Sequence, residues 1–284
     1  MVTGPTVHRR QLGAELRRLR VAAGRLIGES AKALGCSDTR LSRIETGRGG
    51  AVAKERDVRV LCALYGVEDE SKIDMLLTML TNSQKRGWWE SFEEVLPSGL
   101  EVYVGLETDA RAERAWEPLL VHGLLQTPDY ARTVIKATRT HRPADVDDLV
   151  QVRTERQRLL NREGNPLELW AVLDESVIRR PIGGAEVMRT QLRHLRETAD
   201  LLNVMIQIVP FDKRSHPGLG GAFSLLEFED EPSVVYVDNP AGNLYLEKER
   251  DVRRFVHAFD VLKAAAIDPD DSLALIERAA KEMR

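Results

Sequence analysis

Residues 22–48 read AAGRLIGESAKALGCSDTRLSRIETGR, and this stretch decides the fold of the N-terminal part of the chain. Its pattern predicts two short helices, over residues 28–34 and 38–46, joined by the tight turn Gly35-Cys36-Ser37. Two short helices joined in this way are the core of a helix-turn-helix.

The second of these helices carries clear signals at both ends and along one face. Ser37 is a favourable N-cap, and Gly47 is placed to end the helix. Leu41 and Ile44 are spaced to face inward. The polar residues between them are therefore left outside.

Helices are also predicted on either side of this motif. Leu12, Leu16, Leu19 and Ala23 form one apolar stripe that Gly24 ends. Further helices are expected over residues 54–64 and 71–83. Together these elements predict an all-α domain over residues 1–83, followed by a second domain over residues 84–284.

The exposed side of helix 38–46 carries side chains that can contact DNA bases and phosphates. In a helix-turn-helix the second helix enters the major groove with its N-terminal end first. Arginine donates two hydrogen bonds to guanine, and aspartate accepts a hydrogen bond from the amino group of cytosine. Threonine contacts a thymine methyl group or a phosphate. The residues expected to face the bases are Asp38, Thr39 and Arg40. Those expected to face the DNA backbone are Ser42, Arg43, Thr46 and Arg48.

Two acidic residues of this helix have structural alternatives. Asp38 complements the N-terminus of its own helix equally well. Glu45 is interpreted as the partner of an arginine such as Arg20, because phosphates repel a carboxylate.

Charge is divided unevenly along the chain. Residues 1–66 carry 13 Lys/Arg and 6 Asp/Glu, a balance of +7, whereas residues 67–284 have a balance of -11. This division favours a nucleic-acid-binding N-terminal domain followed by an acidic second domain. Chance clustering of surface charges is the alternative.

Composition bounds the class of protein. The 284 residues are 43% hydrophobic and 30% charged, as in globular proteins. No stretch approaches the roughly 18 apolar residues of a membrane helix, and the N-terminus lacks the apolar core of a signal peptide. Cys36 and Cys62 are too few for a disulfide scaffold and are interpreted as small core residues. We expect a cytoplasmic protein that binds no membrane.

The second domain is predicted to be α+β with a mainly antiparallel sheet. Strands are expected over residues 167–173, 204–209, 222–228, 234–237 and 244–246, the last three as an antiparallel meander. Helices are expected over residues 109–116, 128–138, 146–161, 185–202, 249–266 and 271–283. Trp88-Trp89 is interpreted as an anchor that packs the connector onto this domain, with an aromatic surface for bases or a sugar as the alternative.

We expect no enzyme activity, no cofactor and no metal site. The chain has no Walker-type phosphate loop, no GxSxG elbow and no CxxC pair. Residues 218–221 read GLGG but lie between strand-like segments. Asp174, Glu175 and His216 are the only candidates for acid–base chemistry, and structural contacts are preferred for them.

The N-terminal motif resembles the Cro/cI-type (XRE) helix-turn-helix family. The resemblance rests on Ala23-Gly24, Ala31, Leu34-Gly35, Ser37 and the run LSRIExG over residues 41–47. It implies a lambda-repressor-like domain. The family usually starts its first motif helix with Thr or Ser followed by Gln, where this chain has Leu26 and Ile27, and Ser30 replaces a usual leucine. We therefore expect that helix to lack a side-chain cap, which costs about 1 kcal/mol, and a phosphate contact.

The second domain resembles the C-terminal domain of a large class of actinobacterial XRE-type regulators, a domain of unknown function. The segments that carry the resemblance are GLLQTPDYA (123–131), RTERQRLL (153–160), DESVIRRPIGG (174–184), QLRHL (191–195), VPF (209–211), HPGLGGAFSLLEF (216–228) and VVYVD (234–238). His122 departs from the family, which usually has proline there. The resemblance implies a regulator of development or antibiotic production that is often encoded beside a small acidic protein, in a relationship like that of toxin and antitoxin.

These observations predict a transcriptional regulator that binds double-stranded DNA as a homodimer. Its second domain would receive a signal from a small molecule or a protein partner, including a small acidic one. Two alternatives stay open: an antitoxin-like interaction module with weak or lost DNA binding, and an enzyme built on the second domain.

Overall fold

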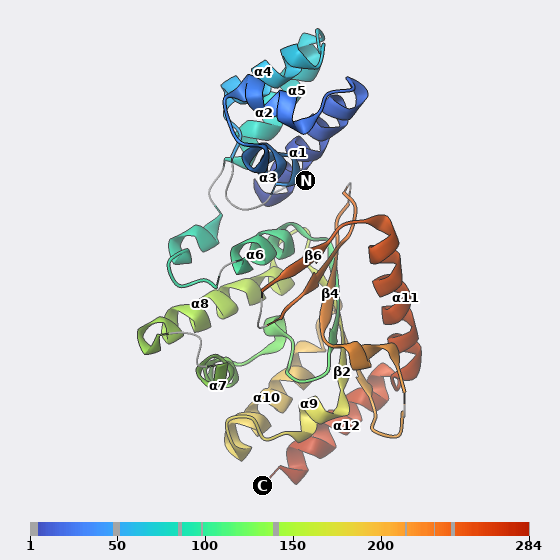
Figure 1. Ribbon diagram of the computed structural model, residues 1–284. Helices are drawn as coiled ribbons and strands as arrows, with labels where there is room; N and C mark the ends of the chain where they lie inside the picture. The colour runs from blue at the N-terminus through green and yellow to red at the C-terminus, as the bar shows by residue number, and fades with distance from the viewer. Residues whose placement is uncertain are drawn as a thin grey trace. The chain divides into compact units, whose positions relative to one another are not determined.

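The computed structural model describes residues 5–47, 52–84, 87–97, 99–138, 142–213, 215–229, 231–239 and 242–283 (Figure 1). The chain forms two compact units. The N-terminal unit comprises Met1–Glu90 and Glu101–Asp109, and the C-terminal unit comprises Ser91–Leu100 and Ala110–Arg284.

The N-terminal unit is helical, and its predicted helices are confirmed. They are α1 (Pro5–Ala22), α2 (Ile27–Leu34), α3 (Asp38–Thr46), α4 (Glu55–Leu64) and α5 (Glu70–Ser83). A further helix, α6 (Leu100–Asp109), has no counterpart in the sequence-based prediction. The 3-10 turn η1 (Trp88–Phe92) lies between α5 and α6.

The core of this unit joins helices α1 to α5, with Ala31 as the buried core residue of α2. Its central side chains are fully or almost fully buried: Leu12, Leu16 and Leu19 of α1, Leu41 and Ile44 of α3, Val58 and Leu61 of α4, and Leu76 and Leu80 of α5. The inward orientation predicted for Leu41 and Ile44 is therefore confirmed. Cys62 is buried in this core and Cys36 packs at its margin, as predicted for small core residues.

Helices α1 and α3 approach one another closely at Gly13. A Cβ atom added to this glycine would lie 2.4 Å from the carbonyl oxygen of Ile44 and 2.8 Å from that of Glu45. Since real Cβ atoms do not come so close to a backbone oxygen, only glycine allows α3 to pack at this distance.

Trp89 anchors the connector within the N-terminal unit. Its side chain is buried, and a Cβ atom added to Gly105 of α6 would lie 3.0 Å from its ring. Gly105 lies in the region predicted to begin the second domain, yet it belongs to the N-terminal unit.

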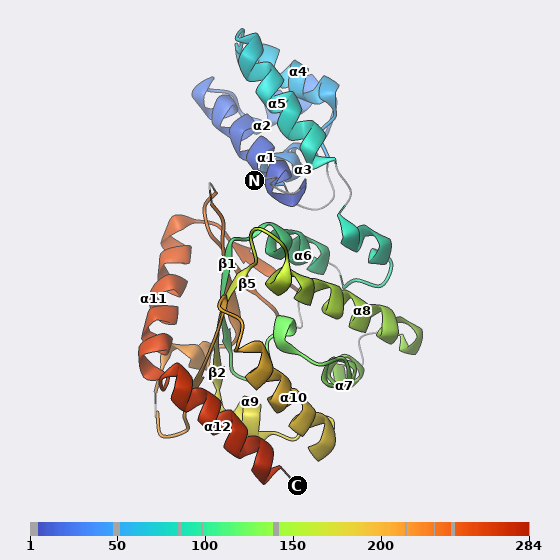
Figure 2. The same cartoon turned by 180° about the vertical axis from the view of Figure 1, so that it is seen from behind.

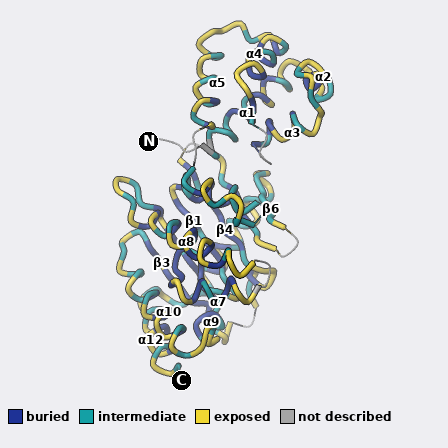
Figure 3. The backbone as a smooth tube through the Cα atoms, turned by 90° about the vertical axis from the view of Figure 1, so that its left-hand side faces the viewer, coloured by how far each residue is buried: buried dark blue, intermediate teal, exposed yellow. Residues whose placement is uncertain are grey.

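The C-terminal unit is built on one six-stranded sheet in the order β3-β2-β1-β4-β5-β6. The strands are β1 (Ala112–Glu117), β2 (Glu168–Asp174), β3 (Val204–Val209), β4 (Phe223–Glu227), β5 (Val234–Val237) and β6 (Leu244–Leu246). The predicted meander of the last three strands is confirmed. Most residues of β1, β3 and β4 are buried (Figure 3).

The sheet is mixed, and one element of the prediction is wrong. Strand β1 pairs in parallel with β2, and β2 with β3, whereas the pairings β1–β4, β4–β5 and β5–β6 are antiparallel. Residues 109–116 were expected to form a helix, but β1 occupies Ala112–Glu117. The local sequence ARAERAW is rich in strong helix formers. Pairing on both sides overrides that preference, because β1 lies in the middle of the sheet.

The remaining predicted helices are confirmed with small shifts at their ends. They are α7 (Pro128–Thr138), α8 (Val146–Gln157), α10 (Ala185–Thr198), α11 (Glu249–Ala265) and α12 (Pro269–Glu282), with a short α9 (Glu175–Arg179) after β2. Helix α11 covers one face of the sheet, while α8 and α10 lie on the other side (Figures 1 and 2). Phe259 and Leu262 of α11 pack on Trp116, Val172 and Leu225 of the sheet.

Candidate nucleic-acid interface

The turn between α2 and α3 is held by hydrogen bonds local to the sequence. Gly35 has φ 67°, in the left-handed region that favours glycine. The amide of Cys36 donates to the carbonyl of Ala31 at 3.0 Å. The Ser37 hydroxyl accepts a hydrogen bond from the amide of Arg40 at 3.2 Å, so the predicted N-cap is confirmed. Gly47 ends α3 with φ 64°.

This frame presents the polar side of α3 to solvent. Asp38, Thr39, Ser42 and Arg43 are exposed. Arg40 and Thr46 are half-buried, and Arg48 lies outside the described residues. The predicted site residues within the described part of the chain therefore share one helix.

Arg40 is held from the side by α4. Its Nη2 donates to Oδ2 of Asp57 at 2.9 Å, and the same oxygen accepts the amide of Lys54 at 3.1 Å. Asp57 is 8% exposed, so this ion pair is partly shielded from water. The guanidinium of Arg40 thus has a protein partner, which the sequence pattern did not predict.

Two other candidates also make contacts within the N-terminal unit. The carboxylate of Asp38 lies beside the first turn of α2, since a Cβ atom added to Gly28 would be 3.5 Å from its Oδ2. The Thr46 hydroxyl donates to the carbonyl of Ser42 at 2.8 Å. Its hydrogen is therefore already used inside the helix.

The first turn of α2 confirms the expected loss of a side-chain cap. Leu26 stands at the N-cap position, makes no side-chain cap hydrogen bond and is 69% exposed. Part of the loss is offset, because the amide of Leu26 donates to Oε2 of Glu29 at 3.1 Å. The Ser30 hydroxyl donates back to the carbonyl of Leu26 at 3.2 Å.

Glu45 is a structural residue, as interpreted from the sequence. Two nitrogens of Arg20 donate to its two carboxylate oxygens, at 2.7 Å and 2.9 Å. Such paired hydrogen bonds are the strong form of an arginine–carboxylate contact. The pair ties α1 to α3 and takes Glu45 away from the exposed face.

The C-terminal unit contains a buried polar cluster that sequence reasoning missed. Nε2 of His122 lies 3.1 Å from Oε1 of Glu113 in β1. The amide of Leu124 lies 3.4 Å from Nδ1 of the same ring, so we assign the ring proton to Nε2, which donates to Glu113. Arg156 of α8 is also buried, close to Gly123. Glu113, Ala115 and Glu117 face one side of β1, a signal that the helical interpretation of this segment obscured.

Glu117 is the member of this cluster with the clearest electrostatic signature. Its pKa is raised to about 7, mainly because burial disfavours the charged carboxylate. Nearby His122 lowers this pKa and Glu113 raises it. An ionised Glu117 therefore destabilises the folded unit relative to a protonated one.

The acid–base candidates of this unit all have structural contacts. Asp174 caps α9 by accepting the amide of Ser176 at 2.9 Å. Glu175 pairs with Arg179 at 3.0 Å and accepts the amide of Phe211 at 3.0 Å. The ring of His216 packs edge-on against Trp116, with 5.1 Å between centroids.

The described residues show neither a metal-ligand cluster nor a membrane-spanning helix. No group of three or more His, Cys, Asp and Glu side chains among them is arranged to hold a metal ion. In the same part of the chain, every helix is too short or too polar to cross a membrane.

Comparison with known families divides the chain in two. A helix-turn-helix domain model matches residues 11–74, which include α2, α3 and their turn. The model of the domain of unknown function DUF5753 matches residues 100–278. No curated protein and no solved structure matches the chain. Because the second model covers more than half of its length, the chain belongs to the DUF5753 family.

Proposed function

We propose that the protein is a sequence-specific transcriptional regulator of the XRE (Cro/cI) type that binds double-stranded DNA. The helix-turn-helix match suggests DNA binding. The observation that carries the proposal is the exposed polar face of α3, with Asp38, Thr39, Ser42 and Arg43 on a helix fixed from behind by the core. In this motif such a face enters the major groove.

The proposed contacts divide by chemistry. Asp38, Thr39 and Arg40 would face base edges, and Ser42, Arg43, Thr46 and Arg48 would face phosphates. Arg40 would reach a guanine either with the N–H groups not bound to Asp57 or by exchanging that carboxylate for the base.

The C-terminal unit would carry the regulatory part of the function. We infer that it senses a small molecule or a protein signal and supports a homodimer, which would place two α3 helices on half-sites about one helical turn apart. The family resemblance adds an actinobacterial, cytoplasmic regulator with a small acidic protein as its partner.

A salt-dependent binding titration tests the proposal. The full chain would be titrated against DNA from its own upstream region and against random DNA of equal length, between about 50 and 200 mM salt. We expect a clear preference for the upstream DNA and an affinity that falls steeply with salt. Equal, weak binding to both DNAs across the series would contradict sequence-specific recognition of this site.

An antitoxin-like interaction module is the second candidate. It is favoured by one observation, the exposed apolar Leu26 at the start of α2, where a helix N-terminus would otherwise bind a phosphate. The absence of DNA binding at about 50 mM salt, together with capture of a partner by the C-terminal unit, would support this candidate.

A further inference from the structure

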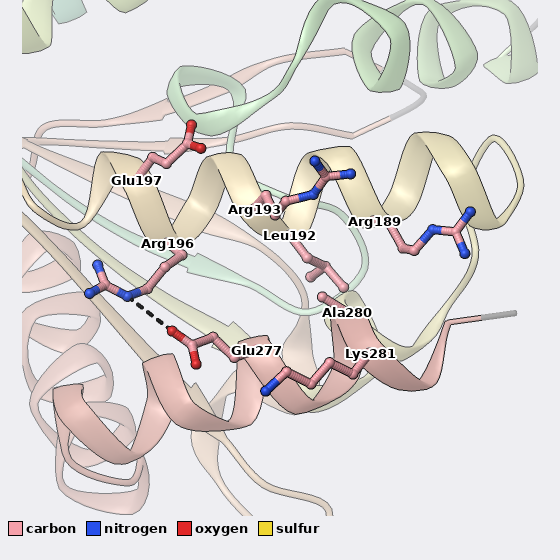
Figure 4. A pocket seen from close by; sticks show the side chains of 8 residues that line it. All are labelled: Arg189, Leu192, Arg193, Arg196, Glu197, Glu277, Ala280 and Lys281. Atoms are coloured by element: carbon pink, nitrogen blue, oxygen red, sulfur yellow. Dashed lines mark ion pairs between the residues drawn. The ribbon is translucent and has the colours of Figure 1, made fainter.

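A groove lies between α10 and α12 of the C-terminal unit (Figure 4). Its cavity volume is about 390 Å³, which lies within the range of about 300–1,000 Å³ typical of small-ligand sites. Its floor is apolar: Leu192 is 1% exposed, and Ala280 is half-buried. Neither the nucleic-acid interface nor the polar cluster around Glu113 uses these residues.

Cationic side chains dominate the rim of the groove. The cations are Arg189, Arg193 and Arg196 of α10 and Lys281 of α12. Two glutamates also line the groove. Glu277 pairs with Arg196 at 3.3 Å, and the side chain of Glu197 extends from the side of α10 that lies away from α12 (Figure 4). Arg196 also pairs with Asp200.

The other three cations have no acidic partner within the part of the chain that the structure describes. Among the described residues, no carboxylate lies within ion-pair distance of Arg189, Arg193 or Lys281, and Arg189 donates only to the carbonyl of Met283, at 3.3 Å. All three are exposed. Several other arginines of the same unit do have carboxylate partners, such as Arg132 with Asp129 and Asp147.

This arrangement is unexpected for an acidic part of the chain. Residues 67–284 carry 11 more acidic than basic residues, so carboxylates are plentiful. Like charges on one rim repel each other, and an anion bound between them would remove that repulsion. The apolar floor would at the same time bury an apolar portion of the ligand.

We propose that the α10–α12 groove binds a small organic anion that has an apolar body and carboxylate or phosphate groups. Leu192 and Ala280 contact the apolar body, and Arg193 and Lys281 hold the anionic groups from the two helices, with Arg189 at the open end. This site lies in the C-terminal unit and does not depend on DNA binding by α3.

Anilinonaphthalene sulfonate is a suitable probe, because it joins an apolar ring system to one anionic group. A fluorescence titration of the full chain should saturate at one site. Its neutral counterpart, phenylnaphthylamine, should bind at least tenfold more weakly. Citrate and inorganic pyrophosphate should each displace the sulfonate dye, and the anion that acts at the lower concentration distinguishes carboxylate from phosphate as the natural group.

Charge reversal in the groove supplies the decisive comparison. The double variant Arg193→Glu/Lys281→Glu should lower dye affinity at least tenfold. Arg254→Glu is the matched control: this exposed arginine of α11 also has no acidic partner among the described residues, and its reversal should change dye affinity less than twofold. If the reversed double variant melts early, Arg193→Gln/Lys281→Gln gives the same test with a smaller change of charge.

Three results would overturn the proposal. These are equal binding of the neutral and anionic dyes, equal losses in the groove variant and in Arg254→Glu, and no loss in either. A fourth result would reassign the groove: if the groove variant keeps its dye affinity but weakens the salt dependence of DNA binding, the cations contact nucleic acid instead.

Discussion

Helix α3 is defined by interactions between residues close in sequence, whereas strand β1 is defined by pairing with residues far away in the sequence. Helix α3 has its N-cap at Ser37 and its C-cap at Gly47, so the groups that start and end it lie beside it in sequence. Strand β1 pairs Ala112 with Glu168 of β2 and with Glu227 of β4, which lie far along the chain. Changes on the exposed side of α3 should therefore alter binding and leave the fold intact, whereas changes in β1 should alter the stability of the C-terminal unit.

The largest effect is expected from Trp116→Ala in β1. Trp116 is completely buried, packs against Phe259 and Leu262 of α11, and donates from Nε1 to the carbonyl of Gly218 at 2.9 Å. Loss of a buried aromatic side chain costs about 3–5 kcal/mol. Urea unfolding followed by circular dichroism would measure this loss in free energy of unfolding.

Thr39→Ala on α3 is the control for that prediction. Thr39 is exposed, so its truncation should change the free energy of unfolding by less than about 0.5 kcal/mol. A loss of similar size in both variants would remove the distinction between α3 and β1.

The next effect concerns Glu117 on the opposite face of β1 and depends on pH. Its folded pKa of about 7 exceeds the value of about 4.3 for an unfolded glutamate. The folded state therefore holds a proton that the unfolded state has released, and the free energy of unfolding falls as pH rises from about 4 to 7. Glu117→Gln cannot ionise, so we expect a gain of about 1–3 kcal/mol above pH 7 and little change near pH 4.

Urea unfolding at several pH values would measure this difference. Glu186→Gln is the matched control, because Glu186 is an exposed glutamate of α10 and its substitution should leave the pH dependence unchanged. A wild-type curve that stays flat between pH 4 and 8 would be inconsistent with a destabilising Glu117.

Arg40→Ala tests whether the α3 face reads bases. If Arg40 contacts a guanine, the substitution should cost about 1–3 kcal/mol of binding free energy and relax the preference at one base pair. The readout is binding to a set of upstream DNAs altered one base pair at a time, with Lys32→Ala, an exposed cation of α2, as the control.

Two results would contradict base reading by Arg40, and one of them follows from its contact with Asp57. Equal weakening on every DNA sequence would make Arg40 a phosphate contact. A lower free energy of unfolding with unchanged base preference would make it a structural partner of Asp57. Asp57→Asn should then reproduce the loss of stability without Arg40 being changed.

The sequence predicted those elements whose determinants are local. The bounds of α3, β3, β5 and β6 match the predicted ranges, since caps, turns and apolar periodicity mark them. Strand β1 was mistaken for a helix because its alanine, arginine and glutamate residues carry helical propensity, and its strand partners lie elsewhere in the chain. The parallel pairing of β1 with β2 was missed for the same reason. That of β2 with β3 was missed although the predicted strand, helix and strand between residues 167 and 209 follow the order of a parallel βαβ unit.

The features of the candidate site also differ in whether local sequence determines them. Ser37, Gly47 and the exposed positions of α3 follow from spacing within the motif. The Arg40–Asp57 pair does not, because it depends on how α4 packs beside α3. The Glu113–His122 contact likewise depends on residues 112–117 forming a strand of the sheet and on the turn that follows this strand.

The smallest effect is expected from Leu26→Asn at the start of α2, where the local sequence is least favourable. Asparagine supplies the side-chain cap that Leu26 lacks, so the N-terminal unit should gain about 0.5–1 kcal/mol in free energy of unfolding. It also replaces an exposed apolar group beside a helix N-terminus with a polar one, which favours a nearby phosphate. We therefore expect upstream DNA to be bound a few-fold more tightly, with an unchanged order of preference among sequences. A gain in stability without any gain in DNA affinity would place this end of α2 away from the DNA, and it would strengthen the case for an interaction module.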